Sequence, residues 1–341
     1  MKIVCAFDSY KGCLTAQEAC RAAAAGLHKR YPEAEILCLP MSDGGEGMVD
    51  CIAEATGSVM TSVAVHGPLM ERVEAWYAIL ADQQTAYMEM AAASGLTLVP
   101  IDKRNPMLTT TLGVGEMILD AVSRGCAKIV MGIGGSATCD GGKGMVQCLT
   151  THLPLPVEIT VASDVTNALY GEQGAAYVFA PQKGATPEQV EILDRQLQDW
   201  AHETEERMQV SPALAHHAGA GAAGGLGYAL MAYLGAQMRS GIDLLLDTIG
   251  FDDKIKDADM ILTGEGKSDS QTLMGKVPMG ILRRAQRYGV PVHLRSGGIE
   301  DADALLKAGF ASVRSINEGD DRALDILMQK DVAMKSLEFR V

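Results

Sequence analysis

Five acidic residues fall at or just after the ends of predicted strands, where side chains can act on a ligand. They are Asp8, Asp43, Asp164, Glu265 and Asp269. Carboxylates in such positions suit Mg²⁺, which prefers oxygen ligands, or a general base that removes a proton from a hydroxyl. Lysines such as Lys11 and Lys267 lie in the same segments and offer balancing charge. A single Asp or Lys is more often a solvated surface residue, so only the combination indicates phosphate chemistry.

Two glycine-rich segments repeat nearly the same motif. "DGGEGMVDC" covers Asp43–Cys51 and "DGGKGMVQC" covers Asp140–Cys148, and each is expected between a strand and a helix. Backbone N–H groups of such loops, together with a helix N-terminus, bind anions such as phosphate. Alternatively, each aspartate caps its helix and the glycines only allow a tight turn. The sequence leaves both interpretations open.

Two further glycine motifs resemble nucleotide-binding signatures. In "ILTGEGKSDSQTLMGK" the first glycine of a P-loop would have to be Ile261, and the next helix starts too far from Lys267, so a P-loop is excluded. "GIGGSA", from Gly132 to Ala137, fits the dinucleotide pattern, but no acidic residue ends a strand about 20 positions later. A nicotinamide-dependent oxidoreductase therefore stays an alternative that rests on this motif alone.

Strands and helices that must position these residues alternate at both ends of the chain. Residues 2–7 and 34–40 predict strands, each followed by a loop and a helix, and the same rhythm returns from residue 257 onward. In the middle, segments such as "RVEAWYAIL" favour antiparallel strands. The predicted fold class is α/β: residues 1–58 plus 257–341 form a Rossmann-like parallel-sheet domain, and residues 59–256 form a large inserted α/β domain of mixed sheet. Ligands commonly bind between such lobes, so the active site is expected in the interdomain cleft.

Two of the predicted helices begin with a complete capping signal. Thr15 is followed three positions later by Glu18, and Thr186 is followed by Gln189. In this pattern the side chain of each residue accepts a hydrogen bond from the backbone N–H of the other residue. Two backbone donors at the helix start are thereby satisfied. The sequence therefore predicts helices that begin at these two threonines.

The composition excludes several classes of partner. The net charge is −14, which opposes attraction to nucleic acid and to anionic membranes, and no uncharged apolar run reaches the ~18 residues of a membrane span. The eight cysteines form no C-x-x-C pair, so zinc is disfavoured. We expect a cytoplasmic protein that binds small molecules, does not bind nucleic acid or membranes, and is a monomer or homodimer.

Six motifs taken together resemble the bacterial glycerate kinases, in matching order. They are "DSYKG" (8–12), "PMSDGGEG" (40–47), "RNPMLTTTLGVGEMILDA" (104–121), "GIGGSATCDGGKGM" (132–145), "SDVTNALYGEQGAAYVFAPQKGAT" (163–186) and "TGEGKSDSQTLMGK" (263–276). The resemblance implies phosphoryl transfer from ATP to D-glycerate, with Mg²⁺, in a Rossmann-like domain with a large insertion. It favours 2-phosphoglycerate as product over 3-phosphoglycerate.

The resemblance also implies a set of site residues. The expected catalytic residues are Lys11, Asp43, Asp164 and Asp269. The expected substrate- and nucleotide-binding residues are Ser9, Gly44, Gly45, Glu46, Arg104, Gly134, Gly135, Ser136, Thr138, Asp140, Gly141, Gly142, Glu265 and Lys267. Asp164 is expected to act as general base, and Lys11 and Arg104 to clamp the anionic groups of the substrates. Asp164 and Asp269 are the expected Mg²⁺ ligands.

Three positions depart from the family pattern. Cys139 stands where the family usually shows Asn, Ser163 where it shows Cys, and Arg295 in a stretch that is usually small and apolar. These departures concern substrate preference and C-terminal packing more than phosphotransfer. A kinase of another small hydroxy acid therefore stays open as an alternative.

Overall fold

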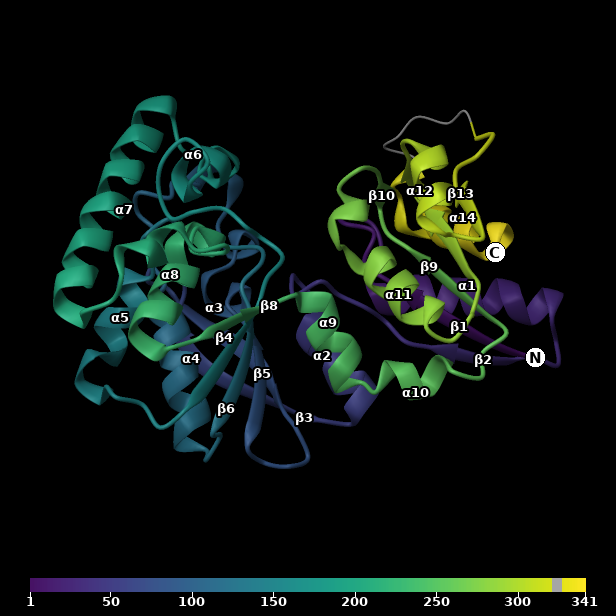
Figure 1. Ribbon diagram of the computed structural model, residues 1–341, viewed down its shortest axis with the longest axis horizontal. Coiled ribbons are helices and arrows are strands. Elements are labelled where there is room, and N and C mark those ends of the chain that lie inside the picture. Colours follow the sequence, from purple (N-terminus) through teal and green to yellow (C-terminus); the bar gives the residue numbers. More distant parts are fainter. Residues whose placement is uncertain (321–326) are drawn as a thin grey trace. The chain divides into compact units, whose positions relative to one another are not determined.

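Both ends of the chain contribute strands to one sheet, while the middle folds around a second sheet. The computed structural model describes residues 1–320 and 327–341. These residues divide into two units (Figure 1). The terminal unit comprises Met1–Asp43 and Ile242–Val341, and the inserted unit comprises Gly44–Gly241. The predicted α/β class is confirmed.

The main sheet of the terminal unit is parallel throughout, in the order β13-β11-β9-β1-β2. A short parallel pair, β10–β12, accompanies it. The elements are β1 (Lys2–Phe7), α1 (Ala16–Arg30), β2 (Glu35–Cys38), α9 (Gly241–Thr248), α10 (Phe251–Ile255), β9 (Met260–Gly264), β10 (Lys267–Ser268), α11 (Val277–Gln286), β11 (Val292–Ser296), β12 (Gly298–Ile299), α12 (Ala302–Ala308), β13 (Ser312–Ser315) and α14 (Lys330–Arg340). β1 is buried from Ile3 to Phe7, as expected of a strand covered on both faces. The Rossmann-like sheet built from both chain ends is thus confirmed.

The sheet of the inserted unit is mixed, in the order β3-β4-β5-β6-β7-β8. β3, β4 and β5 pair antiparallel, whereas β5, β6, β7 and β8 pair parallel. The elements are α2 (Met48–Thr56), β3 (Val59–His66), β4 (Arg72–Ile79), β5 (Thr85–Glu89), α3 (Ala91–Ser94), α4 (Leu112–Ser123), β6 (Lys128–Gly132), α5 (Lys143–Leu149), β7 (Glu158–Ala162), α6 (Ala175–Phe179), the 3₁₀ turn η4 (Pro181–Lys183), α7 (Pro187–Met208), α8 (Ala222–Leu234) and β8 (Gln237–Arg239). The predicted mixed sheet is confirmed.

Both predicted capping boxes form. Thr15 Oγ1 accepts from Glu18 N–H at 3.2 Å, and the Glu18 carboxylate accepts from Thr15 N–H at 3.1 Å, so α1 begins directly after Thr15. Thr186 and Gln189 make the same exchange at the start of α7. Local sequence alone therefore sets these two helix starts.

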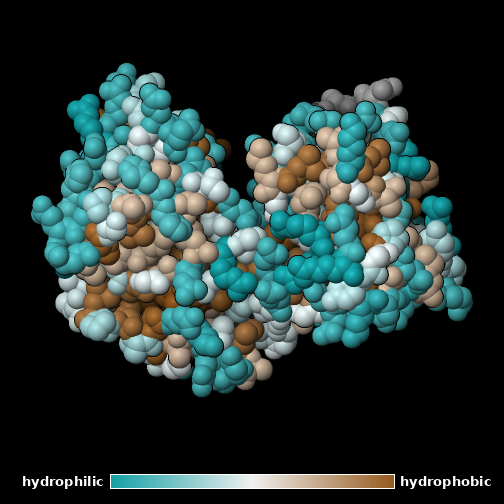
Figure 2. All heavy atoms as spheres, viewed as in Figure 1, coloured by the Kyte–Doolittle hydropathy of each residue, from teal (hydrophilic) through white to brown (hydrophobic). Residues whose placement is uncertain are grey.

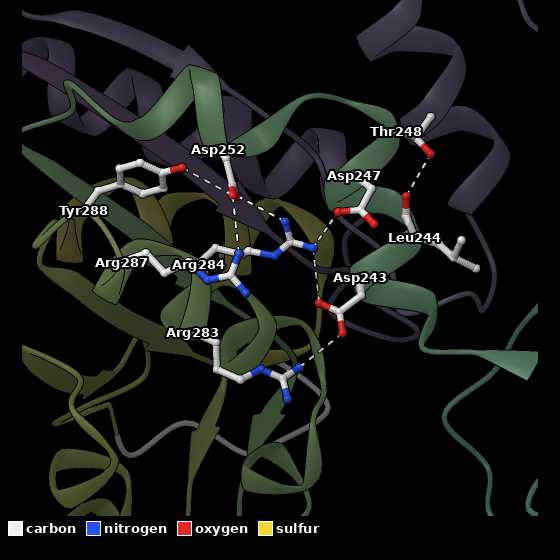
Figure 3. Close-up of polar contacts among 9 residues, drawn as sticks. All are labelled: Asp243, Leu244, Asp247, Thr248, Asp252, Arg283, Arg284, Arg287 and Tyr288. Atoms are coloured by element: carbon white, nitrogen blue, oxygen red, sulfur yellow. Dashed lines mark hydrogen bonds and ion pairs between the residues drawn. The ribbon is translucent and has the colours of Figure 1, made fainter.

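The two units divide some fifteen residues earlier than the sequence suggests at each crossing, at Asp43/Gly44 rather than 58/59 and at Gly241/Ile242 rather than 256/257. The first difference arises because α2 packs on β4 and β5 of the inserted sheet. The second arises because α9 and α10 belong to the terminal unit through Arg284 of α11. Figure 3 shows its guanidinium between the carboxylates of Asp247 (2.6 Å), Asp252 (3.3 Å) and Asp243 (3.5 Å).

The surface of both units is mixed in polarity. Figure 2 shows hydrophilic residues over much of the visible face, with hydrophobic residues in patches between them. None of the helices within residues 1–320 and 327–341 has the length and apolar character needed to cross a membrane. One hydrophobic core of the inserted unit includes Tyr77 and Met88, and one of the terminal unit includes Phe7 and Leu27.

Candidate active site

Buried carboxylates gather at the carboxyl edge of the terminal sheet. Asp8 directly follows β1, Glu265 directly follows β9, and Phe7 and Gly264, which precede them, are register partners. Only 8% of Asp8 and 5% of Glu265 is exposed. Adjacent parallel strands end at the same edge, which is where open α/β sheets bind ligands. Sequence reasoning had noted Asp8 at a strand end without including it in the site.

The Asp8 carboxyl holds its proton more tightly than an ordinary aspartic acid. Burial and the negative charge of Asp43 raise its pKa to about 7, and Glu265 adds to the effect. The Ser9 N–H, which donates to Asp8 Oδ1 at 2.6 Å, and the charge of Lys11 act in the opposite direction. The structure therefore brings the predicted residues Ser9, Lys11, Asp43 and Glu265 around an acidic group that the protein itself does not neutralise.

Glu265 organises the loop between β9 and α11. Its Oε1 accepts from Ser268 Oγ at 3.0 Å and from Thr272 Oγ1 at 2.6 Å, and Oε2 lies 3.9 Å from Lys276 Nζ. Burial raises the pKa of Glu265, although these neighbours oppose the rise. The segment with the Gly-Lys-Ser sequence thus forms the short strand β10 and a carboxylate-centred loop, so the exclusion of a P-loop agrees with the structure.

Lys267 and Asp269 lie on the outer part of this loop. Lys267 Nζ is 2.7 Å from Glu300 Oε1 and 3.9 Å from Asp269 Oδ2, and 56% of its side chain is exposed. Asp269 Oδ1 accepts from Gln271 N–H at 2.8 Å. Both predicted residues therefore share the loop with Glu265, with Lys267 open to solvent.

The inserted sheet presents a second carboxyl edge, to which the parallel strands β5, β6 and β7 contribute. Glu89, Gly132 and Ala162 end β5, β6 and β7 and are register partners across the sheet. Asp164 follows two residues after Ala162 and so belongs to this edge. The expected base and the loop that starts at Gly132 therefore leave the sheet side by side.

Glycines let the loop that contains Gly44 and Gly45 lie directly on the carboxyl edge of the inserted sheet. A methyl group on Gly132 would lie 2.5 Å from the Gly44 carbonyl oxygen, and one on Gly134 would lie 2.8 Å from Gly45 Cα. Gly44 itself has φ +94° and approaches the Ala162 carbonyl. Side chains at these positions would push the loops apart. The structure thus brings together four of the predicted site residues, Gly44, Gly45, the adjoining Glu46 and Gly134.

Asp140 serves as a cap rather than facing outward. Its carboxylate accepts from Gly142 N–H (3.1 Å), Gly144 N–H (3.2 Å) and both the N–H (2.9 Å) and hydroxyl (2.8 Å) of Thr111. These bonds satisfy donors at the start of α5 and fix the segment before α4. Gly141 and Gly142 have positive φ and form the turn into α5. For this loop the capping interpretation describes what the aspartate does.

Glu89 occupies the start of α2 in a similar way and was missed by sequence reasoning. Its Oε1 accepts from Val49 N–H at 2.9 Å, and the Gly47 N–H is a second donor. Burial raises the pKa of Glu89 to about 7 against these bonds, and the charges of Asp50 and Glu46 add to the rise. A carboxylate of the protein therefore sits at the helix start that was expected to meet an anion.

A buried lysine holds the loop after β6. Lys183 Nζ donates to Ser136 Oγ and to the Thr138 carbonyl oxygen, both at 2.7 Å. The Arg104 backbone lies against Gly184, the residue after this lysine, because a methyl group on Gly184 would be 2.2 Å from the Arg104 carbonyl oxygen. The predicted residues Ser136 and Thr138 therefore share Lys183, and the Arg104 backbone adjoins the turn that carries it.

Two of the three departures from the family pattern have structural roles. Cys139 is buried, which raises its thiol pKa to about 11 and makes it a packing residue. Arg295 is also buried, and its guanidinium donates to the carbonyl oxygens of Arg340 and Leu294 and to Ser312 Oγ. Arg295 thereby ties β11 to the end of α14.

The expected Mg²⁺ ligands fall in different units, Asp269 in the terminal unit and Asp164 in the inserted unit. Among the described residues, no group of three or more His, Cys, Asp or Glu side chains is arranged to hold a metal ion. A magnesium site through Asp164 and Asp269 therefore stays a prediction. The dinucleotide alternative gains nothing, because α5 begins only at Lys143, well after "GIGGSA".

Comparison with known proteins relates the whole chain to one family. The family model described as "Glycerate kinase family" matches residues 3–155 and 154–340. Proteins named glycerate kinase from Bacillus subtilis (strain 168) and glycerate 2-kinase from Escherichia coli (strain K12) are each 41% identical to this chain; the matches cover 94% and 93% of the chain and 91% and 90% of those proteins. A crystal structure from Salmonella typhimurium LT2, assigned provisionally as glycerate kinase 2, is 40% identical with a TM-score of 0.80 and covers 99% of this chain and 97% of its own. On this match over both units, the chain belongs to the glycerate kinase family.

Proposed function

We propose that the protein transfers the γ-phosphoryl group of ATP to D-glycerate and forms 2-phosphoglycerate. The observation that carries this proposal is the family match over residues 3–155 and 154–340, which includes every loop described above. The Escherichia coli relative, named glycerate 2-kinase, supports transfer to the hydroxyl at carbon 2.

The acceptor half of the reaction is assigned to the inserted unit. Asp164, at the carboxyl edge beside the Gly132 loop, removes the proton from the attacking glycerate hydroxyl. Arg104 binds the glycerate carboxylate, since a guanidinium can bond both carboxylate oxygens at once. Its Nε is buried and without a protein partner in the described residues. Positioning and proton removal are the contributions that phosphoryl transfer needs from such residues.

The phosphate half of the reaction needs cations, and the terminal unit supplies a fitting environment for one. The raised pKa of Asp8 arises partly from Asp43 and Glu265, so this edge carries negative charge that a divalent cation would stabilise. Asp269 and Asp164 are the proposed ligands of Mg²⁺, which when bound neutralises charge on the transferring phosphate. Lys11 is proposed to contact a phosphate or carboxylate oxygen of the substrates.

We further propose that residues of both units take part in the reaction. The support is the distribution of the candidates along the chain: Lys11, Asp43 and Asp269 belong to the terminal unit, whereas Arg104 and Asp164 belong to the inserted unit.

The proposal is tested by turnover of the purified protein with MgATP and D-glycerate. ADP release gives the rate, and the phosphorus NMR spectrum of the product names the hydroxyl. A phosphate on carbon 2 couples to one proton and one on carbon 3 couples to two, so a doublet supports 2-phosphoglycerate and a triplet overturns that assignment. L-Glycerate, lactate, tartronate and erythronate serve as comparison acceptors. Faster turnover of any of these than of D-glycerate would favour a different hydroxy acid as substrate.

A further inference from the structure

Lys183 is a buried cation whose contacts in the protein are neutral. It ends η4, and only 3% of the residue is exposed. Its two acceptors, Ser136 Oγ and the Thr138 carbonyl oxygen, carry no formal charge. Among the described residues no carboxylate lies within ion-pair distance of its Nζ. Burying an ammonium without a counter-ion costs free energy, so the fold retains this charge against a penalty.

The loop that Lys183 holds is already fixed by neutral bonds. Leu96 N–H donates to the Gly135 carbonyl at 2.8 Å, and Ala137 N–H donates to the Ser94 carbonyl at 2.9 Å. Thr109 Oγ1 also donates to the Ala137 carbonyl at 3.0 Å. These contacts hold the backbone on two sides without any charge. A charged group is therefore not needed merely to fix the shape of the loop.

Two buried polar groups, one on this loop and one on the residue whose backbone lies against Gly184, lack a hydrogen-bond partner among the described residues. Thr138 is completely buried, and its Oγ1 makes no hydrogen bond within the described part of the chain. The same holds for Nε of Arg104, whose backbone lies against Gly184. Buried polar groups in native proteins are nearly always bonded, so unpartnered ones mark a place that a ligand can complete.

We propose that Lys183 is a positioning residue that turns the Gly134–Thr138 loop into a binding site for an oxyanion, with Arg104 as the second cation. Because Ser136 Oγ accepts from Lys183, its own O–H is free to donate to the ligand, and the ammonium makes that hydroxyl a stronger donor. The oxyanion is either the carboxylate of the hydroxy acid or a phosphate of the nucleotide. This assignment deepens the proposed kinase function and rests on it.

The charge of Lys183 gives the site a pH signature. Burial lowers its pKa to about 8, while the titratable groups nearby, Cys139 and Asp140, act in the opposite direction. An oxyanion binds the ammonium form, so affinity falls as the pH rises through 8. If only the protonated form binds, affinity is expected to drop about tenfold between pH 7 and pH 9.

The test compares variants by titration calorimetry between pH 7 and 9.5, with D-glycerate, ADP and sulfate as separate ligands. Lys183→Met is expected to weaken one of the organic ligands at least tenfold at pH 7 and to abolish the loss of affinity toward pH 9. Lys183→Arg is expected to restore part of the affinity with a flat pH profile, because arginine stays charged. Lys143→Met is the matched control: this exposed lysine starts α5, with its Nζ 5.2 Å from the Trp200 ring centre, and should leave both affinity and profile unchanged.

The ligand whose binding responds identifies the oxyanion. A response to D-glycerate assigns the loop to the carboxylate, and a response to ADP assigns it to phosphate. Sulfate binding tests the oxyanion site independently of the organic substrate. The proposed oxyanion site and the proposed kinase function can therefore fail separately. If Lys183→Met does not fold, Lys183→Arg and Ser136→Ala decide. Unchanged affinity and an unchanged pH profile in the folded variants would overturn the proposal, even if the enzyme phosphorylates D-glycerate.

Discussion

Both carboxyl edges hold carboxylates whose pKa values are raised by burial, Asp8 and Glu265 at the terminal edge and Glu89 at the inserted edge, but the inserted edge also has the buried ammonium group of Lys183 beside it. At the terminal edge, Asp8 and Glu265 are carboxylates with raised pKa values, and Asp43 adds a further negative charge close to Asp8. At the inserted edge, the Gly134–Thr138 loop lies on the ammonium group of Lys183, whose pKa is lowered. Each pKa moves toward the uncharged form because the effect of burial is larger than the opposing effect of nearby opposite charges and hydrogen bonds.

Arg284 shows how the same chain treats a charge with a structural role. Its guanidinium meets three carboxylates within 3.5 Å, and these contacts join α9 and α10 to α11 (Figure 3). Charges paired in this way hold elements together, whereas a buried charge with weaker compensation gains more when an oppositely charged ligand binds. The contrast is the basis for the two proposals made above, a cation at the terminal edge and an oxyanion beside Lys183 at the inserted edge.

The largest effect is expected for Asp164→Asn. This variant tests whether the general base is Asp164, at the carboxyl edge of the inserted sheet. The expected result is a fall in kcat of at least ~100-fold with nucleotide binding retained, because the amide cannot accept the hydroxyl proton. Steady-state rates and ADP calorimetry measure the two effects. Asp199→Asn, an exposed aspartate on α7, is the control. Near-normal turnover would show that Asp164 is not the general base, and a carboxylate of the terminal edge would then be the candidate.

A second variant asks whether Asp140 belongs to the fold or to the ligand. Asp140→Ala is expected to lower the free energy of unfolding by about 2 kcal/mol, because four donors lose their acceptor. Chemical denaturation measures the loss, with exposed Asp102→Ala as control. Unchanged stability together with lost ligand binding would assign this carboxylate to the site instead.

The pH dependence of stability tests whether Asp8, at the terminal edge, has a raised pKa. The folded-state pKa of Asp8, about 7, lies above its unfolded value, so its contribution is fully present below the unfolded pKa and is lost as the pH rises through 7. Between pH 6 and pH 8 the wild type should lose about 1.4 kcal/mol more than Asp8→Asn. Glu89 titrates in both proteins and cancels in the difference. Parallel curves would show that Asp8 ionises normally.

The smallest effect is expected at the exposed end of the acidic loop. Lys267 pairs with Glu300 in solvent, so Lys267→Met should raise the KM for ATP by only about threefold, and less at high salt. Initial rates at two salt concentrations measure this, with the exposed Lys256→Met as control. A rise of the KM for ATP above tenfold would mean that Lys267 contacts a phosphate of ATP directly and is the cation that the terminal edge provides.

Local signals in the sequence were sufficient for the fold but not for all of the site. Thr15 and Thr186 cap their helices through residues three positions away, and strand ends mark Asp8, Asp164 and Glu265, so these features could be predicted. Lys183 and Glu89 could not. Lys183 reaches Ser136 across 47 positions and Glu89 reaches Val49 across 40, and only the folded sheet brings these segments together.

The division of the chain was obscured for a related reason. α2 follows a strand and a glycine loop, as it would in a continuing β-α-β unit, yet it packs on β4 and β5 of the other sheet. Periodicity predicts which face of a helix is buried, but it does not say which sheet buries it. The position of α2 therefore depends on tertiary contacts that the local pattern does not encode.

The order of synthesis has a consequence for the sheet that both chain ends share. β1 pairs with β2 on one side and β9 on the other, yet β9 begins only at Met260. At ~5–20 residues per second, translation leaves the β9-facing edge of β1 unpaired on the ribosome for on the order of tens of seconds. During that time the inserted unit can fold to completion, since Gly44–Gly241 is contiguous. The terminal unit must therefore fold last, and its nascent strands are the part of the chain that most needs protection from aggregation.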